Sequence, residues 1–227
     1  MHSRPILSRA FRRCARLLAT GCLALLIAGP SLAQDKDKDK KSEKPAGQPD
    51  EAEMMKMMME MAKPGENHKL MSHAVGAWAY KVKMWMNGDP STPANESSGT
   101  ATTRAIMDGR FLVTDHSGKF QMPGPDGKMM DMDFKGMSIE GYDNAKKKFV
   151  ASWIDNMGTG IMHLEGDYEP AARTLTYRAE YEAMPGMKMK IREVIKMVDH
   201  DHRTFEWYEE RGGAEVKTME ISYTRKT

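Results

Sequence analysis

The segment Gly-Ala-Trp-Ala-Tyr-Lys-Val-Lys-Met at residues 76–84 decides the fold. Large apolar side chains stand at every second position, and small or charged side chains stand between them. The large side chains are Trp78, Tyr80, Val82 and Met84. Successive side chains of a strand point to opposite faces, so a period of two is typical of a half-buried β-strand. One face of this strand is therefore predicted to cover a core.

Segments with the same alternation recur as far as the C-terminus. They are residues 98–106, 111–120, 132–142, 149–155, 160–168, 174–181, 187–198, 204–209 and 216–225. Asp-Gly, Pro-Gly and Gly-Gly pairs between them favour tight turns. Connections this short force neighbouring strands to be antiparallel, and an open row of strands would leave two unpaired edges. The sequence therefore predicts an all-β fold, an antiparallel up-and-down β-barrel of about ten strands over residues 76–227.

Residues 1–33 have the pattern of a secretion signal. Five arginines precede an apolar run over residues 17–28, and the small residues before Gln34 suit cleavage by a signal peptidase. The apolar run is shorter than the ~20 residues that a membrane-spanning helix needs. We therefore expect cleavage before Gln34, a periplasmic or secreted protein, and no stable membrane anchor after cleavage.

Two segments separate this signal from the predicted barrel. Residues 34–50 alternate Asp and Lys and then carry prolines and a glycine, so we expect a disordered charged linker there. Residues 51–75 are predicted to form a short, methionine-rich helical segment, because Met, Glu, Lys and Ala all favour helix. Its first half carries an apolar stripe at helical spacing. The stripe consists of Met54, Met58 and Met61.

Charge and cysteine content exclude several functions for the chain after cleavage. Loss of residues 1–33 changes the formal charge from +2 to −3, because the signal contains five arginines and no acidic residue. A chain with this balance and without a basic stripe is not expected to bind nucleic acid. Both cysteines, Cys14 and Cys22, lie in the signal, which excludes disulfides, thiolate catalysis and cysteine–metal sites. We expect no cofactor, and a monomer or weak dimer.

The more apolar face of each predicted strand is expected to point inward. Six residues on these faces are the candidates for lining a binding pocket: Trp153, Met162, Tyr181, Met189, Glu193 and Trp207. A lone buried carboxylate is costly, so Glu193 should have a structural partner, contact a ligand or have a raised pKa. A barrel of this size holds either a packed core or one small ligand, and the sequence leaves both open.

Two features near the ends of the predicted barrel resemble the calycin group (lipocalins and fatty-acid-binding proteins). Gly76-Ala77-Trp78, preceded by a short helix, looks like the Gly-x-Trp that opens the first strand of those barrels. Arg225 looks like the basic residue of their last strand, which packs over that tryptophan as a cation on an aromatic face. The resemblance implies that Gly76, Trp78 and Arg225 form a structural signature at one end of the barrel.

Several segments are similar to a bacterial, exported family catalogued as domain of unknown function 1579. They are residues 64–70, 83–86, 141–148, 153–160 and 219–225, and the likeness extends over about residues 53–226. The most specific of them is Trp-Ile-Asp-Asn-Met-Gly-Thr-Gly at residues 153–160. The resemblance implies the fold and export, and it brings no catalytic residue.

The predicted interior favours binding over catalysis. Its Met, Trp and Tyr side chains indicate a protein that binds a small hydrophobic or amphipathic ligand. The alternative is a methionine-rich protein that binds copper(I) or scavenges oxidants, since thioethers select Cu(I) and methionine oxidation is reversible. The sequence has no Gly-x-Ser-x-Gly, no His-Glu-x-x-His and no phosphate-binding glycine loop. We therefore assign no catalytic residue and no metal ligand.

Overall fold

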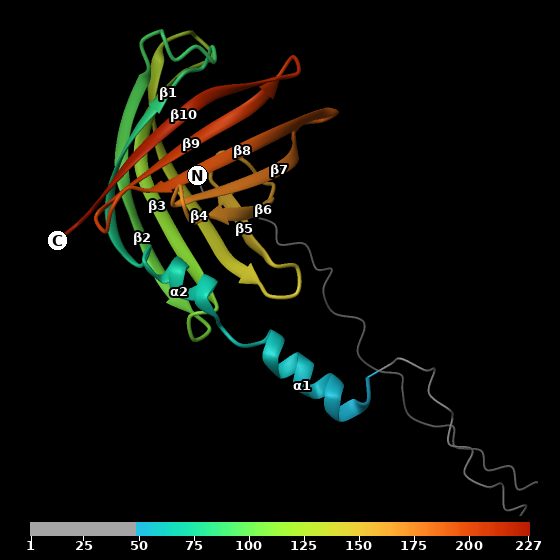
Figure 1. Cartoon of the computed structure of the whole chain (residues 1–227). Coiled ribbons are helices and arrows are strands. Elements are labelled where there is room, and N and C mark those ends of the chain that lie inside the picture. Colours follow the sequence, from blue (N-terminus) through green and yellow to red (C-terminus); the bar gives the residue numbers. More distant parts are fainter. Residues whose placement is uncertain (1–48) are drawn as a thin grey trace, which may run out of the picture. The chain divides into compact units, whose positions relative to one another are not determined.

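The structure is a computed structural model and describes residues 49–227, leaving aside the side chain of Pro123. Two helices precede ten strands (Figure 1). They are α1 (Glu51–Met61), α2 (Glu66–Ser72), β1 (Gly76–Met84), β2 (Asn95–Ile106), β3 (Phe111–Pro123), β4 (Met129–Asp143), β5 (Lys148–Asp155), β6 (Met162–Glu169), β7 (Thr174–Met184), β8 (Met187–Met197), β9 (His202–Arg211) and β10 (Ala214–Arg225). The predicted signal and all but the last two residues of the predicted linker lie outside the described residues.

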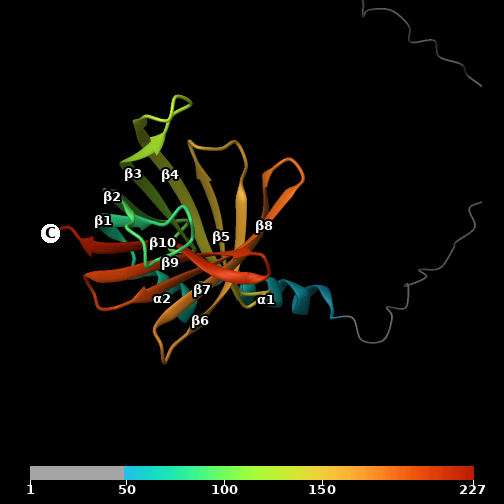
Figure 2. The same cartoon turned by 90° about the horizontal axis from the view of Figure 1, so that it is seen from above.

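The ten strands form a closed barrel. Each strand pairs antiparallel with its neighbours in the sequence, and β1 also pairs with β10. The order around the ring is β1-β10-β9-β8-β7-β6-β5-β4-β3-β2. Figure 2 shows the strands of the barrel from above. The prediction of an all-β, antiparallel up-and-down barrel of about ten strands is therefore confirmed.

The turn between β9 and β10 shows why the strands can return so tightly. Gly212 and Gly213 have φ angles of 61° and 84°. A two-residue type I′ turn needs positive φ at both central positions, which glycine adopts without a Cβ clash. Ala214 pairs with Arg211 directly across this turn, so the turn sets the register of the last two strands.

The helix α2 lies at one end of the barrel (Figure 1), which we call the closed end, and we call the opposite end, where no helix of the described residues lies, the open end. Met71 of α2 packs into a cluster of buried side chains from the strands, and His68 of α2 lies edge-on against Tyr142, with 5.9 Å between ring centroids. The strand residues of this cluster are Leu112, Phe149, Leu164, Leu175, Tyr177 and Ile191. The connections β1–β2, β3–β4, β5–β6, β7–β8 and β9–β10 lie at the other end, since the strands alternate in direction. The helix α2 therefore covers one end of the interior.

The helix α1 is attached near its C-terminus. The side-chain amide of Asn144 donates to the carbonyl oxygens of Met61 (2.8 Å) and Lys63 (2.9 Å), and Nε of Arg110 donates to that of Ala62 (3.1 Å). The structure buries no residue of α1, and Figure 1 shows the helix extending away from the barrel. Within residues 49–227 no helix is long and apolar enough to cross a bilayer.

A stacked group at the closed end joins the first strand to the last. The guanidinium carbon of Arg225 lies 4.2 Å from the ring centroid of Trp78, and that of Arg203 lies 4.5 Å from it. Arg225 also donates to the carbonyl oxygen of Val75 (2.6 Å). Gly76 has a φ of 134°, and a Cβ at this position would meet the guanidinium of Arg225. The structure therefore places the three residues of the predicted signature in one contact group.

Gly99 on β2 allows Tyr80 to pack across it inside the barrel. A Cβ added at Gly99 would clash with the Tyr80 side chain and the backbone oxygen of Ser117. We expect Gly99→Ala to lower the free energy of unfolding by about 1–2 kcal/mol, the usual cost of overpacking a filled interior, as measured by urea denaturation. Gly158→Ala is the matched control, since nothing lies within 4 Å of its Cβ position. Equal stability of the two variants would contradict the close packing at Gly99.

Candidate functional site

The six predicted lining residues lie as three cross-strand pairs on β5 to β9. Trp153 pairs with Met162, Tyr181 with Met189, and Glu193 with Trp207. All six side chains are half-buried, and four of them pack against the buried core cluster. The structure thus brings the six residues together on one side of the barrel interior, and we call this group the lining wall.

The two tryptophans of the lining wall are held in the same way. Nε1 of Trp153 donates to a carboxylate oxygen of Asp155 (2.8 Å), and Nε1 of Trp207 donates to one of Glu209 (3.3 Å). Each acidic residue is two positions further along its strand, so it lies on the same face and nearer the open end. These hydrogen bonds fix both indole planes, which leaves their apolar faces as a preformed surface.

The interior is filled at the closed end and accessible along the lining wall. Leu112 and Tyr177 of the core cluster are only 2% and 1% exposed. The six side chains of the lining wall instead keep part of their surface open to solvent. The sequence left a packed core and room for a guest as alternatives; the closed end is packed, and the side chains of the lining wall keep accessible surface.

Glu193 has no hydrogen-bond or ion-pair partner within the described part of the chain. Burial, and after it the charge of Glu140, raises the pKa of Glu193 to about 8. Its cross-strand neighbours are Tyr177 and Trp207. Of the alternatives that the sequence left for this carboxyl, the structure shows no partner within the described residues and a raised pKa, because the ionised form is poorly solvated.

Glu140 and Tyr177 complete a polar group around Glu193, and we call these three residues the polar band. The hydroxyl of Tyr177 is buried and has no hydrogen-bond partner among residues 49–227. Burial raises the pKa of Tyr177, and the charges of Glu140 and Glu193 raise it further. Glu140 accepts a hydrogen bond from the hydroxyl of Ser138 (2.8 Å). Two carboxyl groups and a hydroxyl without a partner therefore lie near one another in the interior.

Arg203 and His116 also point into the barrel. The guanidinium carbon of Arg203 lies 4.5 Å from the ring centroid of Trp78 and 4.6 Å from that of Tyr223. Its Nε has no hydrogen-bond partner in the described residues. Burial, and after it the charge of Arg203, lowers the pKa of His116 to about 4, so this imidazole is neutral at pH 7. The buried guanidinium of Arg203 is thus in contact with aromatic faces and not with a carboxylate of the described residues.

Sequence reasoning missed Arg203 and two residues of the polar band. Arg203 lies two positions before Phe205 on the inward face, so the period of two would have placed it inside had the strand been extended by one residue. Glu140 gave no comparable signal, because both faces of its strand mix polar and apolar residues. The period of two puts Tyr177 on the inward face of its strand, but nothing in the sequence shows that its hydroxyl lies beside two carboxyl groups.

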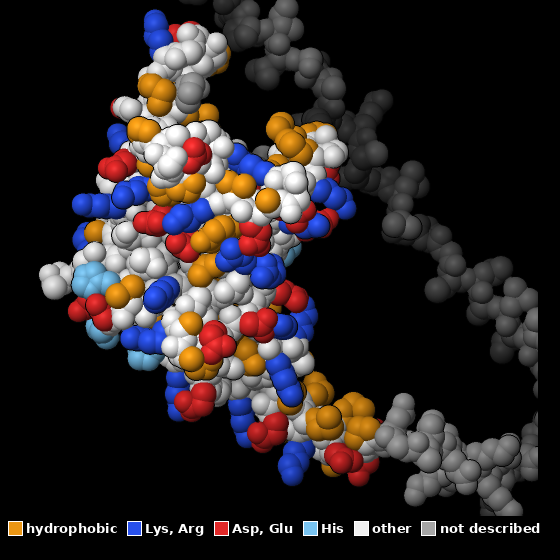
Figure 3. Space-filling model, turned by 45° about the horizontal axis from the view of Figure 1, so that its top comes forward, with side chains coloured by type: hydrophobic (Ala, Val, Ile, Leu, Met, Phe, Trp, Pro, Cys, Tyr) orange, Lys and Arg blue, Asp and Glu red, His pale blue; other side chains and the backbone are white. Residues whose placement is uncertain are grey.

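The methionine clusters lie apart from the lining wall. The six methionines of α1 are 50–61% exposed, and Figure 3 shows hydrophobic side chains gathered on this helix. Met129 and Met130 at the start of β4 are exposed at the open end, as are Met184 and Met187 of the β7–β8 hairpin. Within residues 49–227 no three His, Asp or Glu side chains gather as a metal ion would require.

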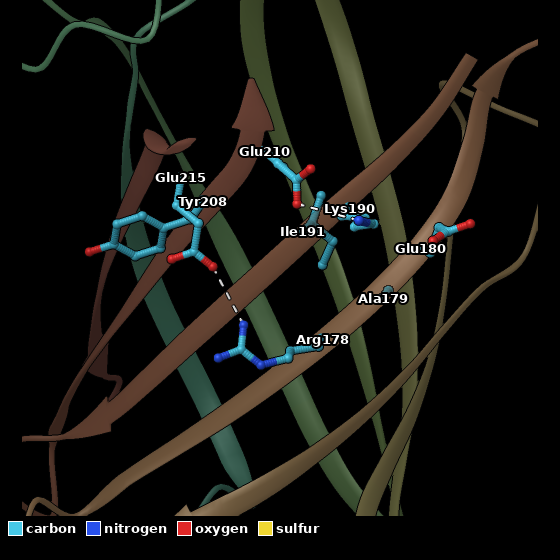
Figure 4. A pocket seen from close by; sticks show the side chains of 8 residues that line it. All are labelled: Arg178, Ala179, Glu180, Lys190, Ile191, Tyr208, Glu210 and Glu215. Carbon is cyan, nitrogen blue, oxygen red and sulfur yellow. Dashed lines mark hydrogen bonds and ion pairs between the residues drawn. The ribbon is translucent and has the colours of Figure 1, made fainter. Parts of the chain in front are cut away.

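A hollow of about 180 Å³ lies on the outer face of β7 to β10. It is lined by Arg178, Ala179, Glu180, Lys190, Ile191, Tyr208, Glu210 and Glu215 (Figure 4). Arg178 lies 3.4 Å from Glu215 and Lys190 lies 3.6 Å from Glu210, while Arg192 makes a closer pair of 2.6 Å with Glu215. These exposed charges already have partners, so the hollow offers a ligand less than the unpaired groups of the interior do.

The closed ring, its covered end and its accessible wall define a ten-stranded antiparallel barrel with a polar band inside. Residues 63–225 match the family described as "Protein of unknown function (DUF1579)". The chain belongs to this family, which confirms the family resemblance drawn from its sequence segments.

Thirteen chains of solved structures match this chain, including the following two. The crystal structure of Rv2717c from M. tuberculosis is 11% identical, with a TM-score of 0.49, over 73% of this chain and 100% of that chain. A protein of unknown function from the DUF3598 family of Nostoc punctiforme PCC 73102 is 7% identical, with a TM-score of 0.24, over 72% of this chain and 100% of that chain. No curated protein sequence matches the chain.

Proposed function

We propose that the barrel binds a small amphipathic molecule at the lining wall. The observation that carries this proposal is that large apolar side chains of the interior, among them Trp153, Tyr181 and Trp207, keep accessible surface. A purely structural core is close-packed, and its large apolar side chains are buried. The accessible surface of the lining wall is what an apolar guest would cover.

The residue types of the lining wall suit the apolar body of such a guest. The two indoles are held by Asp155 and Glu209 and offer flat faces. Met162 and Met189 beside them are unbranched and polarisable, so they adapt to irregular shapes. Ligand sites are mostly apolar, with a few polar groups that fix orientation. The lining wall and the polar band have this composition.

The polar band offers the groups that would bind the polar end of an amphipathic guest. The carboxyl of Glu193 and the hydroxyl of Tyr177 lack partners within the described residues. Polar groups in a protein interior are normally hydrogen-bonded, and an orphan group is costly. The polar end of a bound molecule would satisfy them, which orients the guest with its apolar body against the tryptophans.

We also propose that the protein acts after export, in the periplasm or outside the cell. The basic start, short apolar run and small-residue site of residues 1–33 support this location. The absence of cysteine after residue 33 suits an oxidising compartment. A carrier or scavenger of small amphipathic molecules fits a chain in which no catalytic motif stands out.

Binding of an uncharged apolar probe tests the proposed function. We expect N-phenyl-1-naphthylamine to bind the purified protein with a rise in its fluorescence. The substitution Trp153→Leu should weaken this binding about tenfold, since it removes one fixed indole face. Ile154→Ala is the matched control, because Ile154 is the next residue, faces outward and is 38% exposed. Binding that survives Trp153→Leu but is lost when the methionines of α1 are replaced would contradict an interior site.

A further inference from the structure

We propose that the polar end of the ligand is an organic ammonium group, which binds at Glu193 with Glu140 and Tyr177 around it. This inference rests on the proposed function and names the chemical class of the ligand, a small amine with an apolar body. The interior of the barrel, not its outer wall, would then recognise charge.

Glu193 differs from the other carboxyl groups of the interior in having nothing to hold it. Asp155 and Glu209 accept hydrogen bonds from the indoles of the lining wall, and Glu140 accepts one from Ser138. Glu209 also pairs with Arg211, at 2.7 Å. Glu193 has neither kind of partner within residues 49–227, yet its side chain keeps some accessible surface. Carboxylates inside proteins are normally paired, so a cationic guest is the partner this group lacks.

The hydroxyl of Tyr177 is a second, independent sign of an unfilled polar site. Tyr177 is 1% exposed, pairs across the strands with Glu193, and leaves its hydroxyl without a hydrogen-bond partner in the described residues. A hydroxyl both donates and accepts, and an ammonium group has three donors. An ammonium nitrogen placed between the carboxyl groups would therefore have acceptors in several directions.

The charges around Glu193 favour a cation over an anion. The charge of Glu140 from β4 acts on Glu193, and Glu193 in turn raises the pKa of Tyr177 from β7 and of Tyr223 from β10. The charge of Glu140 favours the cationic form of Arg203, so these two groups compensate one another. Apart from burial, only Glu140 shifts the pKa of Glu193, and no positive side chain offsets it. An organic acid would add negative charge to this group, whereas an ammonium group would neutralise it.

The aromatic side chains of the lining wall suit the same guest. Trp207 is the cross-strand neighbour of Glu193, and Tyr181 and Trp153 lie on the same wall. Aromatic faces attract cations, most strongly where water is excluded. The barrel already holds one cation in this way, since Arg203 stacks on two aromatic rings.

Proton release distinguishes this site from one for a neutral or acidic guest. Because the pKa of Glu193 is about 8, its carboxyl is mostly protonated at pH 7. His116, with a pKa of about 4, is neutral there and adds no charge. An ammonium group favours the carboxylate form, so its binding at pH 7 should release a proton from Glu193. An acid bound near the same carboxyl would raise its pKa further and would not release that proton.

The experiment compares n-octylammonium, n-octanol and n-octanoate by isothermal titration calorimetry on the purified protein at pH 7. Titrations in two buffers of different ionisation enthalpy count the protons released. We expect n-octylammonium to bind about tenfold more tightly than n-octanol, with release of close to one proton. Glu193→Gln should remove this preference and the proton release, so that n-octylammonium no longer binds more tightly than n-octanol. Glutamine copies the shape and neutrality of the protonated carboxyl, so the variant keeps its fold.

Glu165→Gln is the matched control, because Glu165 is an exposed residue of β6 that pairs with Lys146. This substitution should leave all three affinities unchanged. Tighter binding of n-octanoate, or equal binding of all three molecules, would overturn the ammonium site and leave the proposed function standing. Binding of none of them would overturn both. A preference for n-octylammonium that persists in Glu193→Gln would also overturn the assignment.

Discussion

Replacing Arg225 by methionine is expected to lower the free energy of unfolding by about 3 kcal/mol, because it removes several charge-assisted hydrogen bonds and a cation–π contact together. Arg225 donates to the carbonyl oxygens of Val75 (2.6 Å) and His73 (2.8 Å), and its guanidinium lies over Trp78. It also donates to the carbonyl oxygen of His200 (3.2 Å). Methionine keeps a long apolar stem but leaves these carbonyl groups without their donor.

Equilibrium urea denaturation followed by tryptophan fluorescence measures this change. Lys226→Met is the matched control, because Lys226 is the next residue and its side chain is exposed. Its backbone N–H, which donates to the carbonyl oxygen of Ala77 (2.8 Å), is unaffected by the substitution. If Arg225→Met were as stable as Lys226→Met, Arg225 would not hold the first and last strands together.

The second large effect concerns the pH dependence of stability. The pKa of Glu193 is about 8 in the folded protein, against 4.5 for a solvated glutamate, so between these values the folded state binds more protons than the unfolded state. Stability from this group is therefore present below pH 4.5 and is lost as the pH rises through 8. A shift of this size corresponds to about 3–5 kcal/mol.

Glu193→Gln should remove this loss. We expect the variant to be close to wild type in stability at pH 5, and more stable than wild type by about 3 kcal/mol at pH 8. His116 acts in the opposite direction below pH 6.5, because its pKa is lowered to about 4, but it does so equally in both proteins. Denaturation midpoints measured from pH 5 to pH 9 follow the difference. Glu180→Gln, an exposed change on β7, serves as control, and parallel curves for Glu193→Gln and wild type would show that the carboxyl is not desolvated.

The barrel could be predicted because the period of two continues through nearly every strand. Trp78, Tyr80, Val82 and Met84 all point inward, and each strand meets the next through a short turn. Closure of the sheet follows from the two unpaired edges that an open sheet would leave. The lining wall followed from the same alternation, since its six members occupy inward positions on neighbouring strands.

The polar band could not be predicted because it depends on which strands, distant in the sequence, face one another across the interior of the barrel. Glu140 on β4 and Glu193 on β8 are separated by three strands in the ring, and nothing local to either residue shows that the charge of one reaches the other. The missing partner of Glu193 is likewise a property of the closed barrel. Local pattern identifies which face a residue occupies, and only the ring as a whole shows which residue it meets.

The connectivity of the ring also has a consequence for synthesis. Nine of its ten pairings join strands that follow one another in the chain, so they can form as each hairpin emerges. The tenth joins Trp78 to Arg225 and must wait for the last residues to leave the ribosome or the translocation channel. Until then β1 keeps a free edge to which another chain could add a strand. A chain cut short within β10 would keep that edge permanently, and should aggregate or be degraded instead of accumulating as a slightly smaller barrel.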